Sequence, residues 1–268
     1  VEGSRFLRES KPALKHLLGI LLRKYGYASI LAVDSEAKIY SVAASGINIG
    51  DFGMLCNRGF VIKVYNEGEY AEYSFNKLER DVTEQAQQII EQIEALKKAV
   101  PDKLERIKLG MLEDKPLKFS KSTEYEINPF ETGAQNIIDK LTALRKKGLE
   151  ADERMLDCTA RMSCQKYSKL FLSENKDMEQ NVLWTDCAMS FLARRGNEVK
   201  SYFSSASNLG GSEILESLEA DIPHSVEMTV ALLDSEPMVP GEYDCICTPE
   251  VTGMIVHEAF GHGVEMDM

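Results

Sequence analysis

The chain has 268 residues, of which 44% are hydrophobic and 28% are charged, and its net charge at pH 7 is −12. This composition is ordinary for a globular protein that can bury a sizeable core and hold two domains. Apolar runs stay below the roughly 18 residues that span a bilayer, and the N-terminus has no apolar signal segment. We therefore expect a cytoplasmic protein with no membrane partner.

The acidic charge is concentrated towards the C-terminus. Residues 201–268 contain thirteen acidic residues and no lysine or arginine, which leaves the first 200 residues with a net charge of +1. A region this acidic repels nucleic-acid phosphates, so we expect no nucleic-acid partner. It could favour a cation or a cationic peptide, or be balanced by basic residues on a partner.

The first predicted element is an amphipathic helix that ends near Tyr25. Ser10 can cap it, Pro12 suits its first turn and Gly26 supplies a stop. Short apolar or alternating runs then predict strands joined by polar turns. The expected strands are 28–33, 39–43, 57–65 and 70–75, and the expected turns are 34–36 and 66–68.

Two further helices are predicted from their capping residues and apolar stripes. The first covers about 82–99, because Asp81 begins a capping-box pattern. Residues 102–128 are charged and weakly periodic, and we interpret them as a linker or an exposed excursion. The second helix covers roughly 135–147, with Gly148 as its stop.

Antiparallel strands are predicted after the second of these helices. Their ranges are 154–162, 166–172, 182–193 and 199–205, with turns at 173–177 and 195–197. Trp184 lies within one of them, and we expect it to pack rather than to stack on a ligand. The later elements are a helical turn at 212–218, a short helix or strand at 226–233, a strand at 243–248 and a helix at 250–261.

This mixture of helices and antiparallel strands indicates an α+β fold. Pro237 and Pro240 mark a change in the chain. We expect residues 1–235 to form an N-terminal α+β domain and residues 236–268 to begin a second, metal-binding domain of which the remainder is missing.

Six cysteines lie at positions 56, 158, 164, 187, 245 and 247, and none forms a CxxC pair. A cytosolic chain would keep them reduced. Cys245 and Cys247 share one side of the predicted strand, so a thiolate pair is conceivable. The favoured interpretation is that both are small, buried apolar side chains.

The residues that point most directly to chemistry are His257, Glu258 and His262, which form HExxxH. Two neutral imidazoles can coordinate zinc, and an adjacent glutamate can take a proton from the bound water. On an ideal helix the histidines are about 140° apart. Both reach one metal only if the helix widens by one residue or breaks near Gly261. The alternative is two hydrogen-bonded histidines at a helix end.

The segment 237–267, which combines HExxxH with a following Gly-x-Glu-x-Asp, resembles the TldD/PmbA family, once called modulators of DNA gyrase. The resemblance implies a zinc metallopeptidase in which His257 and His262 bind the metal and Glu258 is the general base. The family's third ligand is a downstream cysteine with no counterpart in this chain. Glu265 and Asp267 are candidates to orient a ligand imidazole, or are surface acids.

The same resemblance implies unfolded or precursor peptides as substrates, cut inside the cavity of a dimer formed with a family partner or with a second copy. We expect the 268 residues alone to bind zinc poorly and to be inactive or severely weakened. One rival hypothesis is a non-catalytic dimerisation or regulatory module in which the histidines are structural. Another is a metal-dependent hydrolase that acts on substrates other than peptides. A continuation that carries the cysteine would separate the module from the peptidase.

Overall fold

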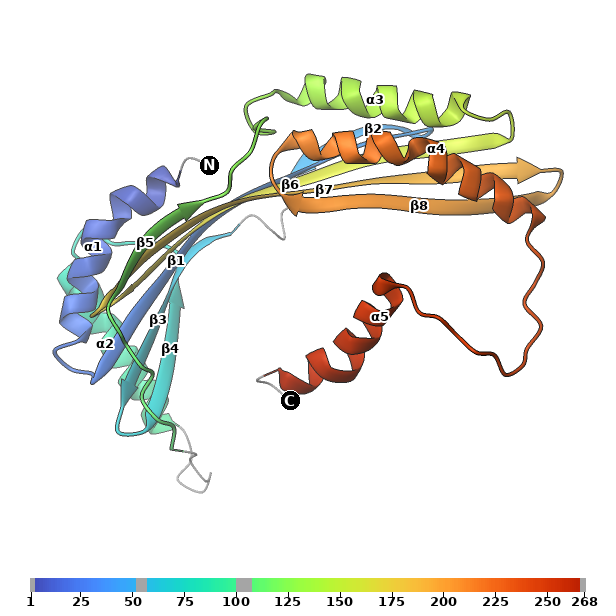
Figure 1. The fold of residues 1–268 in the computed structure, drawn as a ribbon. Helices are drawn as coiled ribbons and strands as arrows, with labels where there is room; N and C mark the ends of the chain where they lie inside the picture. The colour runs from blue at the N-terminus through green and yellow to red at the C-terminus, as the bar shows by residue number, and fades with distance from the viewer. Residues whose placement is uncertain (1–2, 52–56, 100–107, 266–268) are drawn as a thin grey trace. The chain divides into compact units, whose positions relative to one another are not determined.

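The structure is a computed structural model that describes residues 3–51, 57–99 and 108–265. The chain divides into two compact units, Val1–Asp234 and Ser235–Met268. The first unit combines helices with a mainly antiparallel sheet, which confirms the predicted α+β class (Figure 1). Within the described residues, no helix has both the length and the apolar character needed to cross a bilayer.

A single sheet runs through the described part of the first unit. Its strands follow the order β4-β3-β1-β6-β7-β5, with β2 paired to β1 and β8 paired to β7. Neighbouring strands are antiparallel except β5 and β7, which are parallel. The strands are β1 Tyr27–Ala43, β2 Gly46–Asp51, β3 Arg58–Asn66, β4 Glu69–Phe75, β5 Leu117–Ser122, β6 Met155–Ser173, β7 Lys176–Arg195 and β8 Glu198–Leu209.

Two pairs of helices cover different parts of this sheet (Figure 1). Helices α1 (Arg5–Leu21) and α2 (Val82–Ala99) bury one hydrophobic core against β1, β3 and β6. Helices α3 (Ala134–Glu150) and α4 (Leu215–Ala231) bury a second core against β1, β6 and β7. The strands β1 and β6 therefore contribute side chains to both cores.

A polar belt separates the two cores on the helix-covered face of the sheet. Along β1, Ala32 belongs to the first core and Tyr40 to the second, and Asp34 and Glu36 lie between them. The turn predicted at 34–36 was wrong, because the backbone of β1 continues through these residues. Asp34 pairs with Ser168 of β6, and Glu36 pairs with Lys166. The polar run marks a gap between two cores, not a reversal of the chain.

Two predictions from local signals, the cap of helix α2 and the hairpin turn between β3 and β4, are confirmed. Helix α2 has the predicted bounds, and the backbone N–H groups of Thr83 and Glu84 each donate to Asp81 Oδ1 at 3.0 Å. The predicted hairpin joins β3 and β4, with the left-handed backbone at Glu67 and Gly68 that a tight hairpin turn requires.

Three helix boundaries differ from their predictions. Helix α1 ends at Leu21, before the expected stop at Gly26, and Pro12 lies inside this helix rather than in its first turn. Helix α1 begins at Arg5, where the Ser4 hydroxyl accepts a hydrogen bond from the backbone of Leu7, so Ser10 lies inside the helix and is buried. Gly148 does not stop α3 but lies buried within it. A Cβ atom at Gly148 would lie 2.9 Å from the Cys158 sulfur atom, so the glycine permits close packing of α3 on β6.

Other differences arise where pairing or packing partners are distant in sequence. The predicted linker 102–128 contains β5, whose backbone pairs with β7. The two short elements predicted at 212–218 and 226–233 are largely one helix, α4, and Trp184 is 42% exposed rather than packed. The strand predicted at 243–248 is absent, and its Cys245 and Cys247 are exposed rather than buried.

Candidate metal centre

The second unit carries the HExxxH motif at the end of helix α5 (Pro249–Val256). Pro249 occupies the start of this helix, where a missing N–H group is tolerated. Residues His257–Gly261 then form a π-helical turn, in which the backbone N–H of His262 donates to the carbonyl of His257. The predicted widening of the helix is confirmed, and the alternative break at Gly261 is not found, because Gly261 keeps helical backbone angles.

This turn brings the two histidine side chains together. Their ring centroids are 4.5 Å apart, with the planes inclined at 78°. One potential ligand atom from each of His257, Glu258 and His262 lies within 4.8 Å of the others. Such donors in a tetrahedral zinc site lie about 3.4 Å apart, so closing the site requires side-chain movements of about 1 Å. All three residues are exposed, so no buried neighbour blocks these movements.

The side chain of Glu258 also lies near that of His262. Its Oε2 atom is 3.7 Å from His262 Nε2. The two residues are four apart, a spacing that places side chains on one helical face, so the signal was available in the sequence. The carboxylate can consequently reach either a metal ion held by the histidines or a water molecule beside it.

Glu265 contacts the opposite nitrogen of the same ring, because its Oε1 atom is 3.0 Å from His262 Nδ1. Asp267, the other predicted orienting residue, lies outside the described residues. The pairing of Glu265 with a ligand imidazole is the arrangement that commonly supports metal-bound histidine, although its role here stays a prediction.

The described cysteines do not join this group. Cys158, Cys164 and Cys187 are buried in the first unit, where burial raises their thiol pKa values to about 12, 11 and 12. These thiols stay protonated and behave as small apolar side chains, whereas Cys56 lies outside the described residues. Cys245 and Cys247 are exposed in the same unit as the motif but are not part of the cluster that the histidines form.

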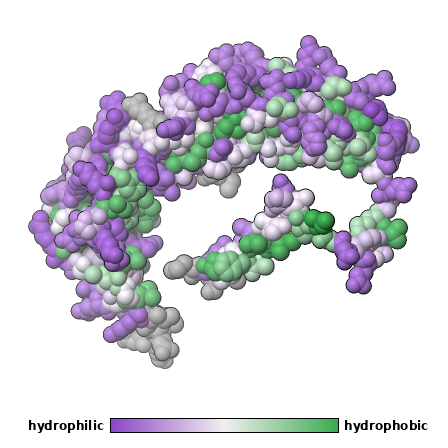
Figure 2. Space-filling model, viewed as in Figure 1, coloured by the Kyte–Doolittle hydropathy of each residue, from purple (hydrophilic) through white to green (hydrophobic). Residues whose placement is uncertain are grey.

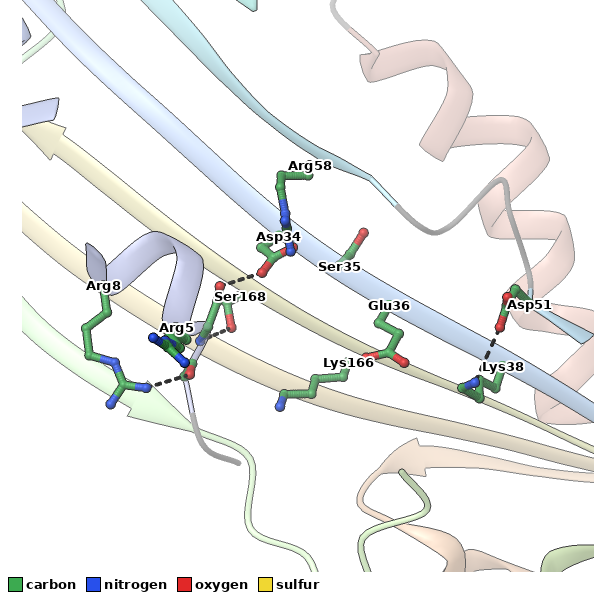
Figure 3. Close-up of a pocket in the computed structure, with 12 residues that line it drawn as sticks. Arg5, Arg8, Asp34, Ser35, Glu36, Lys38, Asp51, Arg58, Lys166 and Ser168 are labelled. Carbon is green, nitrogen blue, oxygen red and sulfur yellow. Dashed lines mark hydrogen bonds and ion pairs between the residues drawn. The ribbon is translucent and has the colours of Figure 1, made fainter. Parts of the chain in front are cut away.

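A different pocket, of about 680 Å³, lies over the polar belt of the first unit (Figure 3). Its described lining contains neither histidine nor cysteine, and several of its charges are already paired. Arg58 Nε lies 2.9 Å from Asp34 Oδ1, and Lys38 Nζ lies 3.4 Å from Asp51 Oδ1. Two of its carboxylates are thus paired with basic side chains and its described lining adds no imidazole or thiol, which leaves the motif of the second unit as the candidate centre.

Comparison with known proteins finds one sequence relative, which is named as a metalloprotease. A scan against protein families finds no matching model. A metalloprotease from Methanothermobacter thermautotrophicus is 34% identical over 82 residues, which cover 30% of this chain and 18% of that protein. The chain thus spans a minor part of this curated relative.

Three solved structures share the fold at low sequence identity. A candidate modulator of DNA gyrase from Thermotoga maritima has a TM-score of 0.63 at 14% identity, covering 86% of this chain and 50% of that one. A candidate gyrase modulator from Bacteroides thetaiotaomicron has a TM-score of 0.58 at 16% identity, covering 83% of this chain and 49% of that one. TldE from Thermococcus kodakarensis has a TM-score of 0.53 at 18% identity, covering 83% of this chain and 47% of that one.

The chain spans about half the length of each of these structures. The sequence identities are too low to transfer an activity, but all three structures share the architecture of this chain. The resemblance inferred from the HExxxH segment is therefore confirmed at the level of fold: this chain has the fold of the TldD/PmbA family.

Proposed function

We propose that this chain forms part of a zinc-dependent peptidase of the TldD type. The observation that carries the proposal is the π-helical turn His257–Gly261, because it places two imidazoles and a carboxylate within 4.8 Å of one another. Two histidines and a carboxylate belong to the ligand types that zinc prefers. The similarity to a protein named metalloprotease supports the same conclusion.

In the proposed site, His257 and His262 hold the metal, and a cysteine from outside these 268 residues completes its protein ligands. When bound, zinc would act as a Lewis acid that makes water a stronger acid and polarises the scissile carbonyl. Glu258 would accept a proton from the attacking water and deliver it to the leaving amine. Its Oε2 atom, 3.7 Å from His262 Nε2, lies close enough to serve a water beside the metal.

By the same proposal the substrates are unfolded or precursor peptides, and the active assembly is a dimer with a family partner or a second copy in the cytoplasm. An extended peptide suits a site whose histidines and glutamate are exposed. The acidic character of residues 201–268 would favour cationic segments over acidic ones.

The test is a Glu258→Gln substitution in the protein that includes the continuation of this chain. We expect the variant to retain its zinc while peptide cleavage falls at least about 100-fold, the lower limit of a typical general-base contribution. Glu242→Ala, which removes another exposed acid from the same unit, is the control and should cleave normally. Loss of zinc in Glu258→Gln would instead make Glu258 a ligand, and unchanged cleavage would remove its role altogether.

A further inference from the structure

We propose that Glu265 is a positioning residue that holds the proton of His262 on Nδ1 and thereby commits Nε2 to the metal. This inference rests on the proposed function, because it concerns the way in which one proposed ligand is presented. It adds a specific assignment of nitrogen atoms, which neither the motif nor the fold provides.

Two contacts from Glu265 converge on His262. The side-chain Oε1 atom lies 3.0 Å from His262 Nδ1, and the backbone N–H of Glu265 donates to the His262 carbonyl at 3.3 Å. The backbone contact closes the 3-10 turn His262–Val264, after which Glu265 adopts an extended conformation. The turn therefore fixes the distance between the two residues, and the carboxylate reaches back to the ring.

The chemistry of the pair determines which nitrogen carries the proton. An ionised carboxylate can only accept a hydrogen bond, so His262 Nδ1 must be the donor. A neutral imidazole with its proton on Nδ1 has its free lone pair on Nε2. In water, neutral histidine more often carries the proton on Nε2, so Glu265 selects the form that would otherwise be the minor one.

The selected lone pair points to the correct side of the cluster. His262 Nε2 is the atom that lies 3.7 Å from Glu258 Oε2, among the potential ligand atoms of the three-residue group. His257 has no comparable hydrogen bond to a ring nitrogen within the described residues, although its ring contacts that of His262. The two histidines are thus unequal, and His262 is the one whose binding atom is prepared before metal arrives.

The test measures the proton position directly, by nitrogen-15 NMR of the histidine rings in the metal-free chain at pH 8. We expect the proton of His262 on Nδ1 in the unmodified chain and in Glu265→Gln, whose amide oxygen can still accept it. In Glu265→Ala the proton should move mainly to Nε2. In the protein that includes the continuation of this chain, titration with Zn²⁺ alone should show an affinity about tenfold weaker for Glu265→Ala. This is the lower end of the effect of removing such a partner, because Glu265 is half exposed.

The charge-matched control is Glu242→Ala, which should change neither the proton position nor the affinity for Zn²⁺. A proton on Nε2 of His262 in the unmodified chain would overturn the proposal, as would a Glu265→Ala variant with the original proton position. If Glu265→Gln behaved like Glu265→Ala, a general effect of charge would replace positioning. If the protein that includes the continuation of this chain binds no Zn²⁺, with or without these substitutions, the zinc site itself is contradicted, while the NMR result still decides the role of Glu265.

Discussion

Replacing a helical glycine by alanine should have opposite effects at two positions of this fold. Gly148 of α3 is buried, and an added Cβ would lie 2.9 Å from the sulfur of Cys158 and 3.1 Å from Cε1 of Phe191. Gly19 of α1 is exposed, and a Cβ there would meet no atom within 4 Å. The pair separates the conformational benefit of alanine from the cost of overfilling a core.

The expected magnitudes follow from these contacts. Alanine stabilises a helix interior by roughly 0.5–1 kcal/mol relative to glycine, and Gly19→Ala should gain this amount. Gly148→Ala gains the same helix stabilisation, but its methyl group would press against Cys158 of β6 and Phe191 of β7. Such overpacking typically costs about 1–3 kcal/mol. We therefore expect a net loss of about 1 kcal/mol for Gly148→Ala, and a difference of nearly 2 kcal/mol between the two variants.

Urea denaturation can measure both changes through the fluorescence of Trp184, the single tryptophan, which lies in β7. The thermal midpoint should fall by about 3 °C in Gly148→Ala and rise by about 2 °C in Gly19→Ala, as expected for a domain of this size. Equal or greater stability of Gly148→Ala would refute the reasoning, because α3 could not then lie so close to β6.

Two further predictions concern the motif and the pH dependence of stability. Deleting Phe260 shortens the spacing to that of two histidines about 40° apart on a regular helix, so Co²⁺ titration of the protein that includes the continuation of this chain should show binding retained. Inserting one alanine after Phe260 should abolish the binding, and equal binding by both variants would contradict the need for convergence. Burial raises the pKa of Asp177, but hydrogen bonds from Lys11 and Lys15 outweigh it and lower the pKa overall. The stabilisation is therefore present above the unfolded pKa of about 4 and lost as the pH falls through the lower folded value. Asp177→Asn should cost about 1 kcal/mol at pH 7 and converge with the unmodified chain in acid; a gap that persists in acid would assign the loss to packing.

Local signals in the sequence predicted those elements whose determinants are themselves local. The hairpin after Asn66 follows from Gly68, which adopts a left-handed backbone without steric cost, and helix α2 follows from its cap at Asp81. The widened turn of the motif was also predictable, because the spacing of His257 and His262 cannot converge on a regular helix. In each case the cause lies within a few residues of the effect.

The errors occurred where the cause is distant in the chain. Asp34 resembles a turn residue until β6 is known to pair with it, and Gly148 resembles a helix stop until Cys158 is known to lie against it. Likewise, β5 becomes a strand only through its pairing with β7. Neither hydrophobic periodicity nor capping patterns in a single sequence identify these distant partners. At the site, the contact between Glu265 and His262 depends on the final turn, which sequence spacing alone could not establish.

Because β1 continues without a break through the polar belt, both cores constrain its register against β6. Side chains of a strand alternate between faces, so Ala28, Ile30 and Ala32 in one core share their parity with Tyr40 and Val42 in the other. A slip of one residue against β6 would turn both sets of apolar groups away from their helices at once. Each core therefore favours the same register of β1 against β6, and a shifted register would lose the apolar packing of both cores at once.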